Sequence, residues 1–230
     1  MILGRGIYLS SLAALFVAAL ILFGCSTGQK KSVEHLFYSA VFTLDDSTCV
    51  TVLAEKIDGG LVIKNGEEDV FVKSQGEGCY SVPVFGGSWT GEWGGGVWTG
   101  DWIDSLRTKD YRVKLEVSPL ENLVPVRGEL VYSVWDTSIG KFKLTQKGDS
   151  AWATFMTSTG DYRYLAGRID TITNEFKIQN FDGVHLFYFE GSIRGDSITS
   201  GVFKSGIHYN TSWNGVRAEN EKVKWSSKQE

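Results

Sequence analysis

The sequence predicts an all-β protein built from antiparallel hairpins, and three observations support this fold class. Glycine is abundant, with 27 residues, and aromatic residues make up 13% of the chain, including eight tryptophans. Such enrichment is typical of strands and tight turns. After residue 33 the chain shows no helical period of apolar residues, but a series of short alternating segments. Successive hairpins of this kind form barrel-like or sandwich-like units, for example a lipocalin-like or avidin-like barrel.

The chain begins with a segment that is typical of an exported protein. One cation, Arg5, precedes an uncharged apolar run over residues 11–23, which ends at Gly24-Cys25. A basic start, a short apolar core and small residues at the end indicate a cleaved secretory signal. The alternative is an uncleaved membrane anchor, although the run is at the short limit of the roughly 20 apolar residues that cross a bilayer.

The end of this segment, Leu22-Phe23-Gly24-Cys25, resembles the lipobox of bacterial lipoproteins, with Phe23 bulkier than is usual at its position. The resemblance implies that residues 1–24 are a lipoprotein signal peptide, which is removed, and that Cys25 is acylated. We therefore expect a lipid-anchored protein of the bacterial cell envelope that faces the periplasm. Residues 25–33 are small and polar, and we expect them to form a flexible tether.

From residue 34 the chain reads as two β-meanders, 34–118 and 127–218, followed by a polar tail at 219–230. In the first meander we expect strands at 35–43, 49–57, 60–64, 68–74, 79–85, 87–93, 97–103 and 110–117. In the second meander we expect strands at 128–136, 139–147, 150–157, 162–170, 174–180, 184–193, 197–204 and 208–218. Asp182-Gly183 fits a two-residue hairpin loop in the second meander.

The strand at 110–117 carries the clearest pattern. Val113, Leu115 and Val117 alternate with charged residues, so we expect these three side chains to face the core. Pro119 and Pro125 follow, and proline interrupts a hydrogen-bonded ladder. This segment is therefore the expected boundary between two packed β units, with one large curled sheet as the alternative.

The charge balance excludes some partners. The formal net charge is −4 and no run of like charges occurs, so the sequence gives no electrostatic reason to bind nucleic acid. We expect the membrane to be contacted through the lipid alone. Two cysteines remain besides Cys25. Cys49 and Cys79 either form a disulfide, as the oxidising periplasm permits, or are two free thiols.

A tandem of aromatic residues is the most conspicuous local motif. Gly87-Ser88-Trp89-Thr90-Gly91-Glu92-Trp93 recurs as Gly96-Val97-Trp98-Thr99-Gly100-Asp101-Trp102, with a glycine turn between the two copies. On paired strands the four indoles lie on one face, and the glycines leave room for the rings to lie flat. The four indoles form either a platform for a sugar or another ligand, or a packed core, and burial statistics favour the core.

A second set of polar residues is a candidate ligand site at one end of a barrel, where loops gather. Its members lie in or beside turns of the second meander: Arg163, Asp182, His185, His208 and Trp213. The alternative is structural, since Gly160-Asp161 and Asp182-Gly183 are turn signals and Arg163 can pair with Asp182.

Templates for catalysis fit the chain poorly. There is no Gly-x-Ser-x-Gly elbow, no Cys-x-x-Cys, and no metal-ligand spacing among the three histidines. The sequence therefore predicts neither a cofactor nor a metal, and it identifies no catalytic residue. Paired carboxylates for sugar hydrolysis stay open, because their separation depends on the fold.

Several segments, taken in order along residues 34–218, resemble one known family. They are Leu61–Glu68, Pro83–Phe85, Gly96–Trp98, Asp110–Arg112, Thr157–Gly167, Phe181–Phe187, Ser205–His208 and Trp213. Together they are similar to the β-rich N-terminal region of lipid-anchored TlpA-type thiol–disulfide reductases. In that family a thioredoxin-like domain follows, and no residue here matches its redox motif. The resemblance implies an accessory domain, either stand-alone or from a truncated relative.

These observations lead to an expected function and two alternatives. We expect a non-catalytic binding or interaction module on a lipid anchor, whose partner is a thioredoxin-like protein, another envelope protein or a small ligand. The first alternative is a glycan-binding or glycan-hydrolysing protein that uses the tryptophan hairpin. The second is redox chemistry at Cys49 and Cys79, as in a truncated thiol–disulfide reductase.

Overall fold

A computed structural model describes residues 36–66, 68–83, 86–104, 112–121 and 125–218. Within these ranges every regular element is a β-strand and all strand pairs are antiparallel, so the predicted all-β class is confirmed. The predicted signal peptide, Cys25, the tether and the polar tail from residue 219 lie outside the described residues. The described ranges contain no helix, and so no apolar helix that spans a bilayer.

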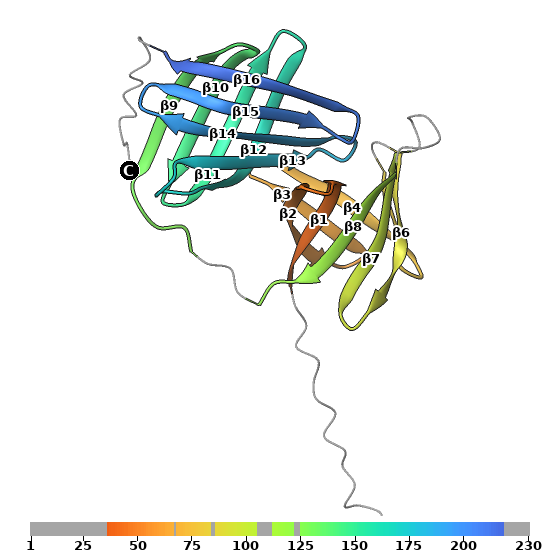
Figure 1. Cartoon of the computed structure of the whole chain (residues 1–230). Coiled ribbons are helices and arrows are strands. Elements are labelled where there is room, and N and C mark those ends of the chain that lie inside the picture. Colours follow the sequence, from red (N-terminus) through yellow and green to blue (C-terminus); the bar gives the residue numbers. More distant parts are fainter. Residues whose placement is uncertain (1–35, 67, 84–85, 105–111, 122–124, 219–230) are drawn as a thin grey trace, which may run out of the picture. The chain divides into compact units, whose positions relative to one another are not determined.

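The sixteen strands form two closed eight-stranded barrels (Figure 1). The first barrel contains β1 Phe37–Asp45, β2 Thr48–Ile57, β3 Gly60–Asn65, β4 Glu68–Gly76, β5 Cys79–Val82, β6 Gly87–Gly94, β7 Val97–Asp104 and β8 Arg112–Pro119. Each strand pairs with the next, and β8 pairs with β1 to close the ring.

The second barrel has the same up-and-down order. It contains β9 Leu130–Thr137, β10 Gly140–Lys147, β11 Ser150–Thr157, β12 Gly160–Ile169, β13 Glu175–Phe181, β14 Leu186–Arg194, β15 Ser197–Ser205 and β16 Tyr209–Arg217. Three residue pairs between β16 and β9 close this ring. Closure gives every strand two paired neighbours, which limits the strand edge that is open to pairing with other chains.

Alternation of apolar and polar residues explains why these segments form barrel walls. In β8 the side chains of Val113, Leu115 and Val117 are buried and the residues between them are exposed, as the sequence predicts. A strand with one buried face places every second side chain in the core. The same alternation runs through β1 and β2, so the interior of the first barrel is filled with side chains.

The predicted tryptophan hairpin is β6–β7, and its register confirms that the rings share one face. Trp89 lies opposite Trp102, Trp93 opposite Trp98, and Gly91 opposite Gly100. The turn uses Gly95 and Gly96 with φ of 62° and 88°, values that favour glycine. The glycine pair leaves room for an indole, because a Cβ added to Gly91 would lie 2.6 Å from the Trp98 ring.

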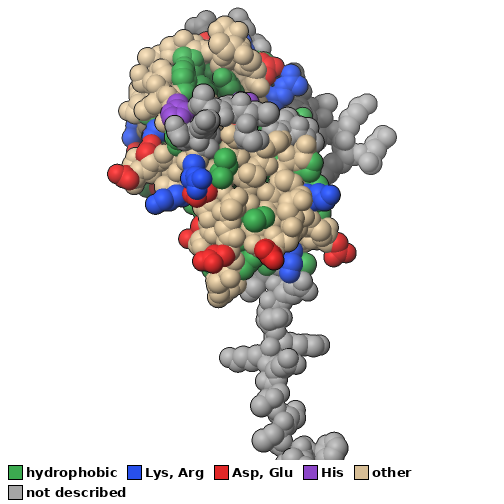
Figure 2. Space-filling model, turned by 90° about the vertical axis from the view of Figure 1, so that its right-hand side faces the viewer, with side chains coloured by type: hydrophobic (Ala, Val, Ile, Leu, Met, Phe, Trp, Pro, Cys, Tyr) green, Lys and Arg blue, Asp and Glu red, His purple; other side chains and the backbone are tan. Residues whose placement is uncertain are grey.

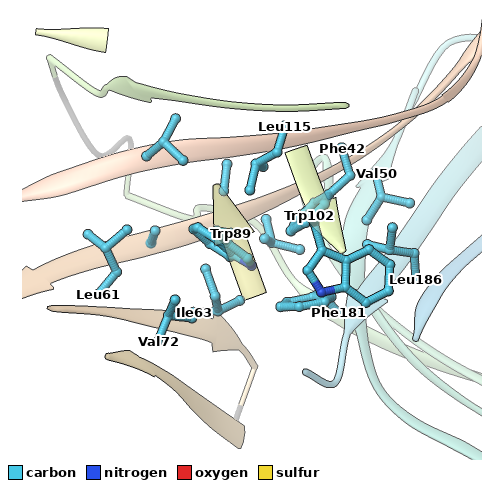
Figure 3. Packing of buried hydrophobic residues seen from close by; sticks show 14 of the residues in the cluster. Phe42, Val50, Leu61, Ile63, Val72, Trp89, Trp102, Leu115, Phe181 and Leu186 are labelled. Carbon is cyan, nitrogen blue, oxygen red and sulfur yellow. The ribbon is translucent and has the colours of Figure 1, made fainter. Parts of the chain in front are cut away.

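Residues of the second barrel complete the core of the first. Both barrels belong to one compact unit, His35–Glu230, and the core cluster of β1–β8 also includes Phe181, Leu186 and Tyr188. Figure 3 shows Phe181 and Leu186 beside Trp102 and Phe42. The Phe181 ring lies 4.7 Å from the Phe42 ring and 5.4 Å from the Trp102 ring between centroids.

A β-bulge accompanies the departure of the β13–β14 hairpin from its own barrel. Between Tyr162 and Leu165 of β12 two residues face a single residue of β11, and Tyr164 has a φ of 56°. β12 pairs with β13 only from Ala166 onward, so the end of β13 is free to diverge. The side-chain amide of Asn65 donates a buried hydrogen bond of 2.8 Å to the Phe181 carbonyl oxygen.

A second contact between the barrels is polar. Lys204 of β15 donates hydrogen bonds to the Asp45 carboxylate, at 2.7 Å, and to the Thr48 hydroxyl. The Lys204 ammonium and the Ser47 amide hold the pKa of the Asp45 carboxyl well below its usual range. The side-chain amide of Gln179 also donates to the Thr51 carbonyl oxygen at 2.6 Å. The barrels are therefore joined by specific hydrogen bonds as well as by apolar packing.

Candidate functional site

The candidate site is a cavity of about 540 Å³ at one end of the second barrel. In an up-and-down barrel the β9–β10, β11–β12 and β15–β16 hairpins all turn at this end, and each contributes to the wall. We call this cavity the mouth. Its lining residues are Ser138, Ile139, Thr157, Ser158, Thr159, Tyr162, Phe203, Ser205, His208 and Tyr209. Figure 2 shows the molecule from the right-hand side of Figure 1, and hydrophobic side chains gather in the upper part of this view.

Two of the turns that form the mouth share a sequence motif and a hydrogen-bond pattern. The motif Thr-Ser-x-Gly occurs at 137–140 and again at 157–160. In both turns the threonine hydroxyl donates to the glycine carbonyl oxygen and accepts from the amide two residues after the threonine. Gly140 and Gly160 have φ of 146° and 148°. The repeated motif places one serine from each hairpin, Ser138 and Ser158, on the wall of the mouth.

Aromatic rings form the floor of the mouth. Phe203 is 4% exposed and stacks on Phe189 with 4.3 Å between ring centroids and an interplanar angle of 3°. The rings of Tyr162 and Tyr209 lie 5.0 Å and 5.4 Å from Phe203. Below this layer the barrel is filled, since Phe189 packs in turn on Phe155. The mouth is therefore a shallow site above a solid core rather than a channel.

The structure separates the polar residues that the sequence placed in one candidate site. Asp182 and His185 lie together in the β13–β14 hairpin, with 3.0 Å between the carboxylate and Nδ1. His208 lines the mouth. Arg163 pairs with Asp161 at 2.9 Å, and not with Asp182, the partner that the structural alternative named. The competing partner is local, because residues two apart on a strand share a face.

Asp182 stabilises the hairpin tip instead of joining a site. Its carboxylate accepts hydrogen bonds from the Val184 and His185 amides at 2.9 Å and 2.6 Å. Burial raises the pKa of the Asp182 carboxyl, but hydrogen bonds from the His185 side chain and from these amides lower it more, so the net shift is downward. The pKa of the Glu68 carboxyl on β4 is raised, first by burial and then by the charge of the nearby Asp182.

The tryptophans are placed mainly in cores. Trp89, Trp98 and Trp102 are fully buried in the first barrel, and Trp213 is 3% exposed in the second. Trp93 is 41% exposed, and its indole nitrogen donates to the Tyr80 hydroxyl at 3.0 Å. Three of the four indoles of the hairpin are thus enclosed, and the packed-core alternative describes them. An accessible platform of four indoles does not form.

The two cysteines of the first barrel are free thiols. Cys49 is exposed at the start of β2, and Cys79 is partly buried at the start of β5, with β3 and β4 between them in the sheet. Neighbouring strands are about 4.8 Å apart, and β2 and β5 are three such spacings apart in the sheet. This exceeds the distance of about 7 Å over which a disulfide joins two Cα atoms.

Among the described residues, no group of three or more His, Cys, Asp or Glu side chains is placed to hold a metal ion.

The fold and the mouth define a class of protein: two closed up-and-down β-barrels in tandem, one of which carries a cavity of ligand size. Comparisons with known proteins add no narrower assignment. No protein-family model matches the chain, and neither a curated protein nor a solved structure matches it.

Proposed function

We propose that this chain is a lipid-anchored protein of the bacterial cell envelope whose barrels act as a non-catalytic binding module. The ligand is a small molecule held in the mouth of the second barrel. The observation that carries the proposal is the mouth itself, a cavity of about 540 Å³ at the open end of a closed barrel. Ligand sites are usually concave, of about 300–1,000 Å³, with apolar walls and a few polar groups.

The composition of the mouth supports binding of a ligand in one orientation. Tyr162 and Tyr209 offer ring surface, and the serines at 138, 158 and 205 offer hydroxyl groups from three different turns or strands. Because the floor is packed on Phe189 and the turns are fixed by threonine hydrogen bonds, the site is largely formed before a ligand arrives. Preformed sites bind with a smaller loss of conformational entropy.

The anchor is tested by mass spectrometry of the protein taken from envelope membranes. We expect a mature chain that begins at Cys25 and carries fatty acyl groups, because the Leu22–Cys25 segment resembles a lipobox. Cys25→Ser is expected to abolish acylation, so that no fatty acyl group is found on the chain. Cys49→Ser is the matched control, since Cys49 is an exposed thiol in the barrel wall, and it should keep the acyl groups. An unmodified Cys25 in the wild-type protein would contradict the anchor.

Binding at the mouth is tested by NMR with a library of small charged and uncharged compounds. We expect some compounds to change the chemical shifts of the protein mainly at the backbone amides of residues 138–139, 157–159 and 205–209. Tyr209→Ala should weaken such a compound about tenfold, equivalent to about 1.4 kcal/mol, because it removes a ring from the rim. Tyr164→Ala, on the partly exposed wall of β12, is the control and should leave the affinity unchanged. If no compound changes the chemical shifts of residues at the mouth, the proposed binding function is wrong.

A further inference from the structure

We propose that the ligand of the mouth is an uncharged carbohydrate ring. This inference rests on the proposed function, because it names the class of compound for the same cavity. It differs from the glycan hypothesis based on the tryptophan hairpin, because the residues that carry it are hydroxyl and aromatic side chains of the second barrel. Three properties of the mouth support it: the hydrogen-bonding character of its wall, the geometry of its rings, and its charge.

The wall offers hydroxyl groups that are not used by the fold. Within the described residues, the hydroxyls of Ser158, Ser205, Tyr162 and Tyr209 make no hydrogen bond to another protein atom, whereas Thr157 donates to Gly160 at 2.8 Å. A hydroxyl group both donates and accepts hydrogen bonds. The hydroxyl groups of a sugar do the same, so each contact can form in either direction, and a ligand with several hydroxyls matches several lining groups.

The rings provide a surface for the apolar face of a pyranose. Phe203 lies flat on Phe189, and the planes of Tyr162 and Tyr209 are inclined to it by 58° and 60°. Phe203 itself is buried, so the ring surface open to a ligand is that of Tyr162 and Tyr209. The carbon-bound hydrogens on one face of a sugar ring are apolar, and they pack on aromatic rings while the hydroxyls at the ring edge stay available for hydrogen bonds.

The lack of acidic and basic side chains in the lining of the mouth disfavours an ionised ligand. Among the described residues that line the cavity there is no Asp, Glu, Lys or Arg. Asp161 and Arg163, on the neighbouring stretch of β12, already form an ion pair with each other at 2.9 Å. A charged ligand that enters such a site loses hydration without meeting a carboxylate, ammonium or guanidinium group on the wall, which is costly.

The test uses matched pairs of sugars and the NMR map of the whole protein. The probes are the methyl glycosides of glucose and galactose, and the corresponding methyl uronates, in which a carboxylate replaces the C6 hydroxymethyl group. We expect a neutral glycoside to shift the mouth amides and to bind at least about tenfold more tightly than its uronate. Ser158→Ala combined with Ser205→Ala should weaken the glycoside several-fold. Ser150→Ala, at the opposite end of the same barrel, is the control.

Each other outcome has a distinct meaning. If uronates bind as well as or better than glycosides, the carbohydrate inference is overturned in favour of a charged ligand. If uncharged aromatic compounds occupy the mouth and none of the glycosides does, the inference is also overturned, but the proposed binding function stands. If no compound of any class shifts the mouth amides, both the inference and the proposed function fail.

Discussion

Phe181→Ala is expected to lower the free energy of unfolding by about 3–5 kcal/mol, the usual range for deleting a buried aromatic ring. Phe181 is completely buried, and its ring contacts Phe42, Trp89 and Trp102. These three residues belong to the first barrel, whereas Phe181 ends β13 of the second. The substitution should therefore open a cavity in a barrel to which the residue does not belong by sequence.

Two measurements test this prediction together. Urea denaturation gives the loss of stability, and amide hydrogen exchange shows where the protein has loosened; exchange should accelerate in β1, β6 and β7. Phe71→Ala is the matched control, because Phe71 is 40% exposed on β4, and its cost should stay within about 0.5 kcal/mol. Faster exchange confined to β9–β16 would show that Phe181 does not support the first barrel.

Gly91→Ala is expected to cost about 1–3 kcal/mol, the range for adding a methyl group to a packed core. A Cβ at this position would lie 2.6 Å from the Trp98 ring and 2.7 Å from the Gly100 Cα atom. Trp98 has little freedom to move, since it is fully buried and its indole nitrogen donates to the Gly78 carbonyl oxygen at 2.8 Å. The hairpin must therefore shift as a whole.

The control for this prediction lies three residues further along the same strand. A Cβ added to Gly94 meets no atom within 4 Å, so Gly94→Ala should change stability by less than about 0.5 kcal/mol. Urea denaturation measures both variants, and near-ultraviolet circular dichroism reports on the packing of the indoles. Equal stability of the Gly91→Ala and Gly94→Ala proteins would mean that the tryptophan does not need the glycine pair.

The sequence was sufficient to predict the strands, because each carries its own local signal. Alternation located β8, and the glycine turn with its repeated flanks located β6–β7 and the register of its tryptophans. Such signals arise within one hairpin and survive in any context. The ends were less certain: β12 begins two residues earlier than expected and contains a bulge, whose positive φ at Tyr164 leaves no mark in the residue type.

The contacts between distant segments were not predictable from alternation. In β13, the alternation set by Phe176 and Ile178 puts Phe181 on the opposite face, and nothing in it shows that this face is buried among residues of the other barrel. The mouth was missed for a related reason. Its hydroxyl residues look like ordinary turn residues, although the repeated Thr-Ser-x-Gly motif at 137–140 and 157–160 was a usable signal. Of the expected site residues, His208 lines the mouth.

The dependence of the first barrel on Phe181 and Leu186 has a consequence for the order of events during synthesis. A chain that emerges amino terminus first delivers β1–β8 well before β13 and β14. Until the later segment arrives, the core residues of the earlier half that pack on Phe181 and Leu186 lack these partners, and exposed apolar surface of this kind attracts chaperones or other nascent chains. The core of the amino-terminal half is therefore complete only once residues 181–186 have been added, and not when its own eight strands are complete.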